Sequence, residues 1–165
     1  MKVFTDIAKQ LGLIEASYDT AAQLVWTFSF PTNPVWEELK SRWNFWVTVP
    51  PLVTADEIEA LNRCIERHDI YFVTSRPRTR GLTVDKQTRL WLNSIGVRAD
   101  YVLATKTGTK GRLANALDIE LALDDYDANL IDLDNAGVKA VCRRWSYNTW
   151  TPAVDSLGEF IERWM

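Results

Sequence analysis

Short apolar runs alternate with amphipathic segments along the chain from Thr54 onward. The apolar runs predict buried strands, which we place at residues 70–73, 101–104, 121–123 and 139–142. The amphipathic segments predict helices, which we place at 54–67, 84–95, 110–117, 127–133 and 153–164. An alternation of strands and helices implies a parallel sheet covered by helices, so the pattern indicates an α/β fold.

Two local signals mark the boundaries of these helices. The sequence Thr54-Ala55-Asp56-Glu57 is a capping-box pattern, in which a threonine and a glutamate three residues later satisfy the first backbone N–H groups of a helix. Gly96 follows the second predicted helix and is expected to end it.

The first third of the chain has a different texture. Residues 1–52 are irregular and rich in aromatic side chains, and they are interrupted by four prolines. We expect short helices there, at about residues 5–11, 17–25 and 34–42. A chain of 165 residues is the size of one domain. We therefore expect a single domain, with a small helical, cap-like region at 1–52 and an α/β core at 54–165.

Composition and charge narrow the class of protein. The chain is 47% hydrophobic and 25% charged, and its net charge of −3 argues against a general nucleic-acid binder. We find no signal peptide and no apolar run of the roughly 18 residues that a membrane span needs, so we expect a soluble, cytoplasmic protein without a membrane partner. The two cysteines lie in apolar contexts and indicate no disulfide framework.

The polar residues that follow the predicted strands are the candidates for chemistry, because ligands of parallel sheets bind at the carboxyl ends of the strands. Thr74, Ser75 and Arg76 come directly after the first strand, and Arg78 follows. Hydroxyl, backbone N–H and guanidinium groups at such a turn can hold a phosphoryl oxygen. By itself, the same pattern is also typical of a polar turn with local capping.

Two further groups follow later strands. Lys106 and Lys110 lie beside glycines before a helix and can neutralise a phosphate, although the spacing is not that of a P-loop. Asp124 and Asp125 follow a buried strand, and adjacent carboxylates suit a hard cation such as Mg²⁺. The alternative is that Asp125 or Asp127 caps the N-terminus of the next helix.

The order of these motifs, Thr-Ser, then Lys, then Asp-Asp, resembles the haloacid dehalogenase-like (HAD) phosphohydrolases. Residues 44–46, 50–52, 71–77 and 87–92, with the Asp-Asp pair, look like the 5′(3′)-deoxyribonucleotidase branch of that superfamily. The likeness covers about residues 35 to 150. It implies a HAD-like sheet flanked by helices, a Mg²⁺ cofactor and phosphoryl transfer through a covalent aspartyl-phosphate.

Carried over residue by residue, the resemblance assigns a role to each candidate. Thr74 would bind the phosphoryl group with Ser75 beside it, and Lys110 would offset its charge, with Lys106 as the alternative. Asp124 and Asp125 would hold Mg²⁺, directly or through water. The groups implied near the substrate are the guanidinium groups of Arg76 and Arg78 and the base-stacking rings of Phe45 and Trp46.

The sequence departs from this family at its start, because the opening Asp-x-Asp motif is missing. In one register Lys2 to Thr5 form a short strand and Asp6 is the nucleophile, with Ala8 in place of the second aspartate. In the other register residues 5–11 are a helix with Thr5 as its N-cap, and the nucleophile strand is absent. Both registers lose the general acid/base, which is typically worth about 10²- to 10⁴-fold in rate.

Three hypotheses follow. The first is a nucleotide- or phosphomonoester-binding protein with impaired or lost phosphatase activity, for which a phage or mobile-element origin would fit. The second is an active Mg²⁺-dependent 5′-nucleotidase that uses Asp6. The third is a protein-interaction module on a HAD scaffold, with exposed tryptophans as its functional surface. If the nucleophile strand is absent, the strands that carry Thr74 and Asp124 either pair directly or leave room for a partner or a second copy.

Overall fold

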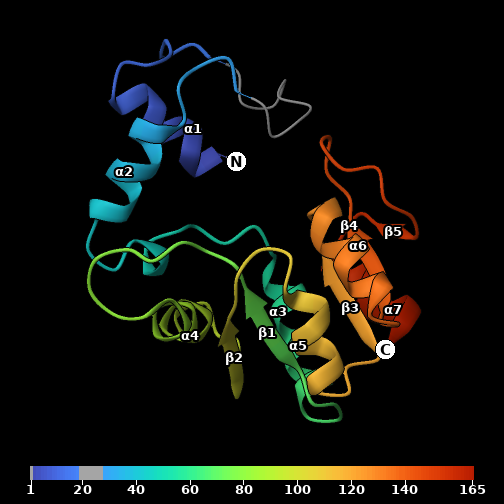
Figure 1. The fold of residues 1–165 in the computed structure, drawn as a ribbon. Coiled ribbons are helices and arrows are strands. Elements are labelled where there is room, and N and C mark those ends of the chain that lie inside the picture. Colours follow the sequence, from blue (N-terminus) through green and yellow to red (C-terminus); the bar gives the residue numbers. More distant parts are fainter. Residues whose placement is uncertain (1, 19–27) are drawn as a thin grey trace.

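The computed structural model describes residues 2–18 and 28–165, so most of the helix expected at 17–25 lies outside the described residues. Helices and strands follow one another in the predicted alternation (Figure 1). The helices are α1 (Lys2–Gln10), α2 (Asn33–Ser41), the 3-10 helix η1 (Phe45–Val47), α3 (Ala55–Ile65), α4 (Val84–Ser94), α5 (Lys110–Ala116), α6 (Asp127–Asn135) and α7 (Leu157–Trp164). The strands are β1 (Tyr71–Thr74), β2 (Tyr101–Ala104), β3 (Leu121–Asp124), β4 (Lys139–Arg143) and β5 (Ala153–Val154).

All the strand pairs are parallel, which confirms the α/β class. Strand β1 pairs with β2 from Tyr71 opposite Tyr101, and β3 pairs with β4 from Leu121 opposite Lys139. Strand β5 extends the second group by pairing with β4. The expected single sheet is therefore divided, because β1 and β3 are not hydrogen-bonded to each other in the described part of the chain.

The predicted elements of the core have the right type, and most boundaries agree within one or two residues. The last predicted helix is wrong in part, because residues 153–164 do not form one helix. Ala153 and Val154 form β5 beside β4, and α7 begins only after Ser156. The Ser156 Oγ atom accepts a hydrogen bond from the Glu159 N–H at 2.9 Å, so this serine caps the helix.

The capping box before α3 is confirmed and has a second role. Thr54 and Glu57 exchange both hydrogen bonds of the box. The Glu57 carboxylate also accepts hydrogen bonds from the backbone N–H groups of Leu157, at 2.9 Å, and Gly158, at 3.2 Å. One carboxylate thus satisfies the first N–H groups of two helices that are about a hundred residues apart in the chain, and it ties α3 to α7.

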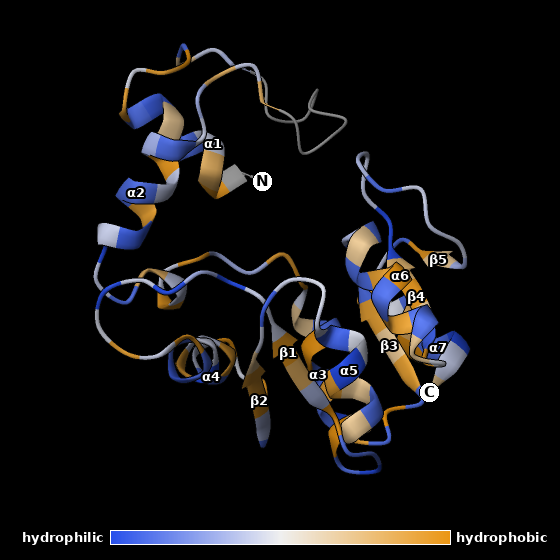
Figure 2. Cartoon of the chain, viewed as in Figure 1, coloured by the Kyte–Doolittle hydropathy of each residue, from blue (hydrophilic) through white to orange (hydrophobic). Residues whose placement is uncertain are grey.

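Apolar side chains between the strands and their helices form the core. One cluster, with Leu61, Leu92 and Val102, lies between β1 and β2 and their helices. A second, with Leu130 and Ala140, joins β3 and β4 to α6. Figure 2 shows hydrophobic residues along the strands and on the inner faces of these helices. Among the described residues, no helix is long and apolar enough to cross a membrane.

Helices α1 and α2 form a separate part with its own core. Phe4, Ile7 and Val35 are buried in it, and the Phe4 and Trp36 ring centroids are 4.7 Å apart. The strand expected at Lys2 to Thr5 is wrong, because these residues begin α1. Phe4, Ile7 and Ala8 have helical spacing, so a helix buries all three on one face. Thr5 is fully buried inside this helix and is not its N-cap.

Candidate functional site

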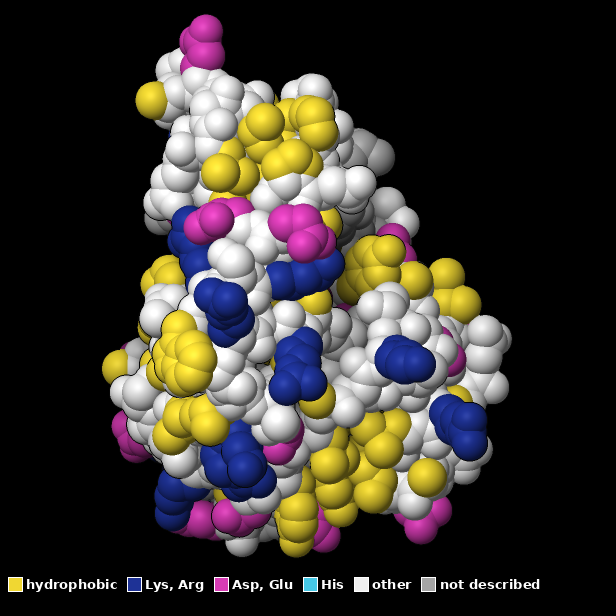
Figure 3. All heavy atoms as spheres, turned by 60° about the vertical axis from the view of Figure 1, so that its left-hand side comes forward, with side chains coloured by type: hydrophobic (Ala, Val, Ile, Leu, Met, Phe, Trp, Pro, Cys, Tyr) yellow, Lys and Arg dark blue, Asp and Glu magenta, His cyan; other side chains and the backbone are white. Residues whose placement is uncertain are grey.

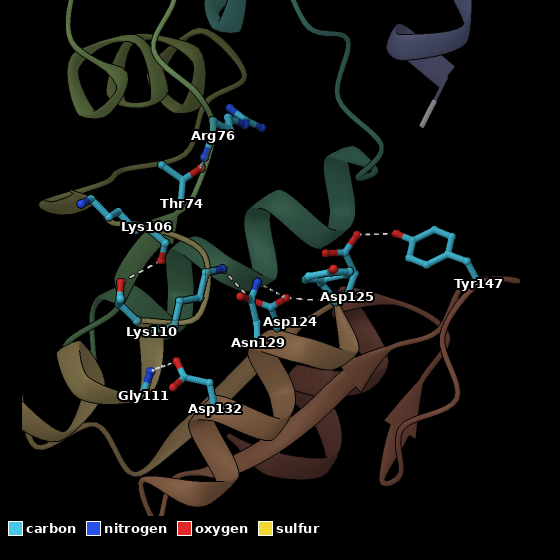
Figure 4. A network of polar contacts seen from close by, with 12 residues as sticks. Thr74, Arg76, Lys106, Lys110, Gly111, Asp124, Asp125, Asn129, Asp132 and Tyr147 are labelled. Atoms are coloured by element: carbon cyan, nitrogen blue, oxygen red, sulfur yellow. Dashed lines mark hydrogen bonds and ion pairs between the residues drawn. The ribbon is translucent and has the colours of Figure 1, made fainter. Parts of the chain in front are cut away.

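The candidate residues gather at the carboxyl ends of β1 and β3. Figure 4 shows Thr74 and Arg76 at the end of β1. It also shows Lys106 in the loop after β2, Lys110 at the start of α5, and the acids Asp124 and Asp125 at the end of β3. Both strands point the same way, so their carboxyl ends open to the same side of the molecule (Figure 1). Helices α1 and α2 lie beyond that side. The parallel topology therefore brings the three predicted motifs into one region.

Lys110 and Asp124 form a buried ion pair at the centre of this region. The Lys110 Nζ atom lies 2.6 Å from Asp124 Oδ2, and the two side chains are 13% and 5% exposed. The other carboxylate oxygen accepts hydrogen bonds from the Tyr126 N–H, at 3.0 Å, and from Asn129 Nδ2, at 3.1 Å. Asp124 thus combines a charge partner with hydrogen bonds from the residues that begin α6. The N-cap of α6 is Tyr126 and no side chain caps it, so the cap expected from Asp125 or Asp127 is not formed.

Asp125, unlike Asp124, is exposed. Its carboxylate accepts a hydrogen bond from the Tyr147 hydroxyl at 2.5 Å, and its backbone carbonyl accepts one from Asn148 Nδ2 at 2.9 Å. Tyr147 and Asn148 belong to the loop after β4 and are not among the residues predicted for the site. Only their position after a strand could have indicated them, as for the other groups at this edge.

Arg76 is held between two indole rings. Its guanidinium carbon lies 5.0 Å from the Trp46 ring centroid and 5.5 Å from that of Trp91. Burial lowers the pKa of Arg76, and the charge of Asp125 acts in the opposite direction. The Arg76 Nη1 and Ser75 Oγ atoms are buried, and neither has a hydrogen-bond partner among the described residues. Buried polar atoms without partners are rare in folded proteins, so these two need a partner that the described chain does not supply.

Thr74 lies where the motif predicts it, at the last position of β1. Its Oγ1 atom accepts a long hydrogen bond from the Arg76 N–H, at 3.4 Å. Its backbone carbonyl accepts one from the Thr105 N–H at 2.9 Å, which fixes the end of β1 against the segment after β2. The threonine hydroxyl keeps its hydrogen for another acceptor.

The two predicted base-stacking rings differ in position. Phe45 is only 5% exposed and packs in the core around α1 and α2, so we remove it from the candidate site. Trp46 is partly exposed, and its indole N–H donates to the Pro77 carbonyl at 2.9 Å. This hydrogen bond and the contact with Arg76 make Trp46 a support for the loop after β1.

Lys106, Lys110 and Arg78 differ in how deeply their side chains are buried. Lys106 and Arg78 are exposed, whereas Lys110 is partly buried against Asp124. The start of α5 is held by a hydrogen bond from Thr109 Oγ1 to the Lys106 carbonyl, at 2.7 Å. On the face in Figure 3, basic side chains are interspersed with hydrophobic and acidic ones and form no continuous basic surface.

Asp6 is not part of this region. It is half-buried on α1, which packs against α2. Figure 1 shows α1 well apart from the strands. The structure therefore brings Thr74, Arg76, Lys106, Lys110, Asp124 and Asp125 into one region (Figure 4), with Ser75 next to Thr74 in the chain. It places Asp6 elsewhere, on α1.

Oxygen ligands for a hard cation are present but few. Among the described residues, no three histidine, cysteine or acidic side chains form a metal-binding group. Mg²⁺ is commonly held by one or two carboxylates with waters and substrate phosphate oxygens, which Asp124 and Asp125 fit. Two further oxygens near β3, Asn129 Oδ1 and Asp127 Oδ1, are buried without a hydrogen-bond partner in the described chain. The donor set thus suits Mg²⁺ delivered with a phosphate.

Comparisons with models of protein families, with curated proteins and with solved structures found no match to this chain.

Proposed function

We propose that the protein binds a nucleotide or a small phosphomonoester at the carboxyl ends of β1 and β3, on a HAD-like scaffold of the 5′-deoxyribonucleotidase type, with phosphatase activity impaired or lost. One observation carries the proposal. The Arg76 guanidinium is positioned between two indole rings, and its Nη1 atom is buried with no partner in the described chain. A planar guanidinium is well suited to phosphate oxygens.

The neighbouring groups supply the rest of a phosphate site. The hydroxyl groups of Thr74 and Ser75 would donate to phosphoryl oxygens, and Lys110 would share its charge between Asp124 and the bound group. Asp124 and Asp125 would hold Mg²⁺, which neutralises phosphate charge when bound. Arg78 and Lys106, which are exposed, would attract the anion without fixing its position.

Loss of hydrolysis follows from the position of the acids. Asp6, the candidate nucleophile, lies on α1 apart from the strand ends. Asp124 is engaged by Lys110 and by the first turn of α6, and Asp125 by Tyr147. A carboxylate that attacks phosphorus must reach it with a free oxygen. Within the described residues we identify no such carboxylate beside Thr74.

The proposal is tested by thermal shift on a panel of 5′- and 3′-(deoxy)nucleotides with Mg²⁺, with phosphate release measured on the same samples. We expect one nucleotide to raise the stability without release of phosphate, by about 2.7 kcal/mol at 100 times its Kd. Arg76→Lys should weaken this effect, because an ammonium cannot replace the fork of the guanidinium. Arg163→Lys, at an exposed pair on α7, is the matched control and should change nothing.

Two outcomes would replace this function. Phosphate release that disappears in Asp6→Asn would show an active nucleotidase that uses this aspartate. An absence of stabilisation by every nucleotide, with and without Mg²⁺, would remove the phosphate site altogether. The remaining candidate would then be an interaction module, for which the division of the sheet is the relevant feature.

A further inference from the structure

The two halves of the sheet present unpaired edges to each other. Strand β1 is bonded to β2 on one side only, and β3 is bonded to β4 on one side only. Figure 1 shows the arrows of β1 and β3 running in the same direction, with α5 in front of the space between them and α3 behind it. Within the described chain, the backbone groups on both inner edges lack a strand partner.

A cleft of about 930 Å³ lies between these edges. Both strands and the helices α3, α5 and α7 line it. Its middle is apolar, with Leu61, Phe72, Leu121, Leu123, Phe160 and Ile161 among its walls. The charged lining residues lie toward its ends, before the strands or at the carboxyl end of β3: Arg67, Asp69, Asp118, Glu120, Lys110 and Asp124. An occupant must therefore be uncharged over its central residues, because an unpaired charge there would be desolvated.

The burial of the strands shows that this part of the core is incomplete. All four residues of β1 and the first three of β3 are only partly buried, although they are mostly apolar. By contrast, the three central residues of β4, Ala140–Cys142, are fully buried. Strands of a parallel sheet that carries helices on both faces are normally buried throughout. Strands β1 and β3 are partly exposed because no strand lies between them.

The backbone edges decide which kind of occupant fits. An extended chain offers N–H and C=O groups on both of its sides, so it can bond to β1 and β3 at once. A helix satisfies its own backbone and leaves both edges unpaired, and it is about 10–12 Å wide with its side chains. A small apolar molecule would fill volume but would satisfy neither edge. Addition of a strand is the mode of recognition that uses both edges.

We infer that the cleft between β1 and β3 is a docking site for an extended, uncharged, apolar segment of another polypeptide chain, which adds as a strand between them. The segment is about four to six residues long, because the flanking strands have four residues each. It runs parallel to both and joins the two halves into one continuous sheet. The inference goes beyond the proposed function, since a protein with no affinity for nucleotides could bind such a strand.

Hydrogen exchange on the full-length protein tests this inference. The probe is a synthetic peptide of about six valine and isoleucine residues, flanked by lysines for solubility. The matched control has proline at alternate positions, which removes the N–H donors on one side. Without a probe, we expect fast exchange of the β1 and β3 amides that point into the cleft. With the valine–isoleucine peptide, these amides should exchange at least about tenfold more slowly, and with the proline peptide they should not.

Other results would overturn the inference. Slow exchange of these amides without any probe would mean that β1 and β3 pair directly. Equal effects of both peptides, or no effect of either, would mean that the cleft does not take a strand. A dimer in light scattering whose dissociation makes these amides exchange fast would identify a second copy as the occupant instead. Leu123→Lys, which places a charge in the cleft wall, should abolish the effect of the peptide. The proline control keeps the test valid if that variant does not fold.

Discussion

The Lys110 ammonium lies 2.6 Å from the Asp124 carboxylate and joins the first residue of α5 to the last residue of β3. Both side chains are largely buried, so neither charge is well solvated. The pair holds α5, which begins in the loop that follows β2, against the half of the sheet that contains β3. It also places a cation beside the proposed phosphate site without leaving a net charge in the apolar surroundings.

Removal of one partner from this pair should be more harmful than removal of both charges. Lys110→Met leaves the Asp124 carboxylate buried without its cation, and we expect it to lower the free energy of unfolding by about 2–3 kcal/mol. The double variant with Asp124→Asn should recover part of this loss, because no charge remains buried. Urea unfolding of the two single variants and the double variant measures the difference. Equal stability of Lys110→Met and the wild type would contradict the burial of the pair.

The second residues of two helices should respond in opposite ways to the same substitution. A Cβ atom on Gly111, in α5, would overlap the Asp132 backbone carbonyl oxygen, whereas one on Gly158, in α7, would meet no atom closer than 3.7 Å. We expect Gly111→Ala to destabilise by about 1–3 kcal/mol, since α5 and α6 must separate. Gly158→Ala should be neutral or stabilise by up to about 1 kcal/mol, from helix propensity alone. Thermal unfolding of both variants measures these changes. Destabilisation by both would refute the steric explanation.

Glu57 should make stability depend on pH through its double capping role. Burial acts to raise the pKa of Glu57, but the N–H groups of Thr54, Gly158 and Leu157 outweigh it, so the pKa lies below the ordinary value of 4.5. A carboxylate with a lowered pKa stabilises the folded state above its ordinary pKa, and this contribution is lost as pH falls through the folded value.

Glu57→Gln should therefore cost about 1 kcal/mol at pH 7, and the difference from the wild type should shrink below pH 4.5. The control is Glu59→Gln on the same helix, which affects only an exposed pair with Arg63 and should change stability by less than about 0.5 kcal/mol. Denaturant unfolding across this pH range provides the comparison. A constant difference at all pH values would exclude the charge of Glu57 as its cause.

Cys142 should be inert in the folded protein. Its side chain is fully buried at the end of β4, and burial, followed by the nearby charges of Asp127 and Asp125, raises the pKa of the thiol to about 11. Reaction with iodoacetamide requires the thiolate, so at pH 8 we expect labelling of Cys142 only after unfolding. Mass spectrometry of peptides from native and denatured samples measures the labelling, and rapid native labelling would show that β4 is accessible.

Local patterns determined most of the fold. The strands at Tyr71–Thr74 and Tyr101–Ala104 were predicted within one residue, and so was the capping box before α3. These features depend on residues within one turn or one strand, and the hydrophobic period is visible without knowledge of neighbours. The sequence order also predicted that the Thr-Ser, Lys and Asp-Asp motifs lie near one another, because parallel strands direct their carboxyl ends to the same side.

The tertiary structure alone decided the contacts between distant segments. An apolar strand has the same sequence pattern whether it is central or has an open edge, so the division between β1 and β3 could not be read from the chain. The choice of Lys110 over Lys106 as the partner of Asp124 depends on how α5 packs. Likewise, the burial of Phe45 and the separation of Asp6 from the strands arise because α1 and α2 form their own core. In each case the stabilising free energy comes from contacts between groups that are far apart in the sequence, and no local pattern contains information on such contacts.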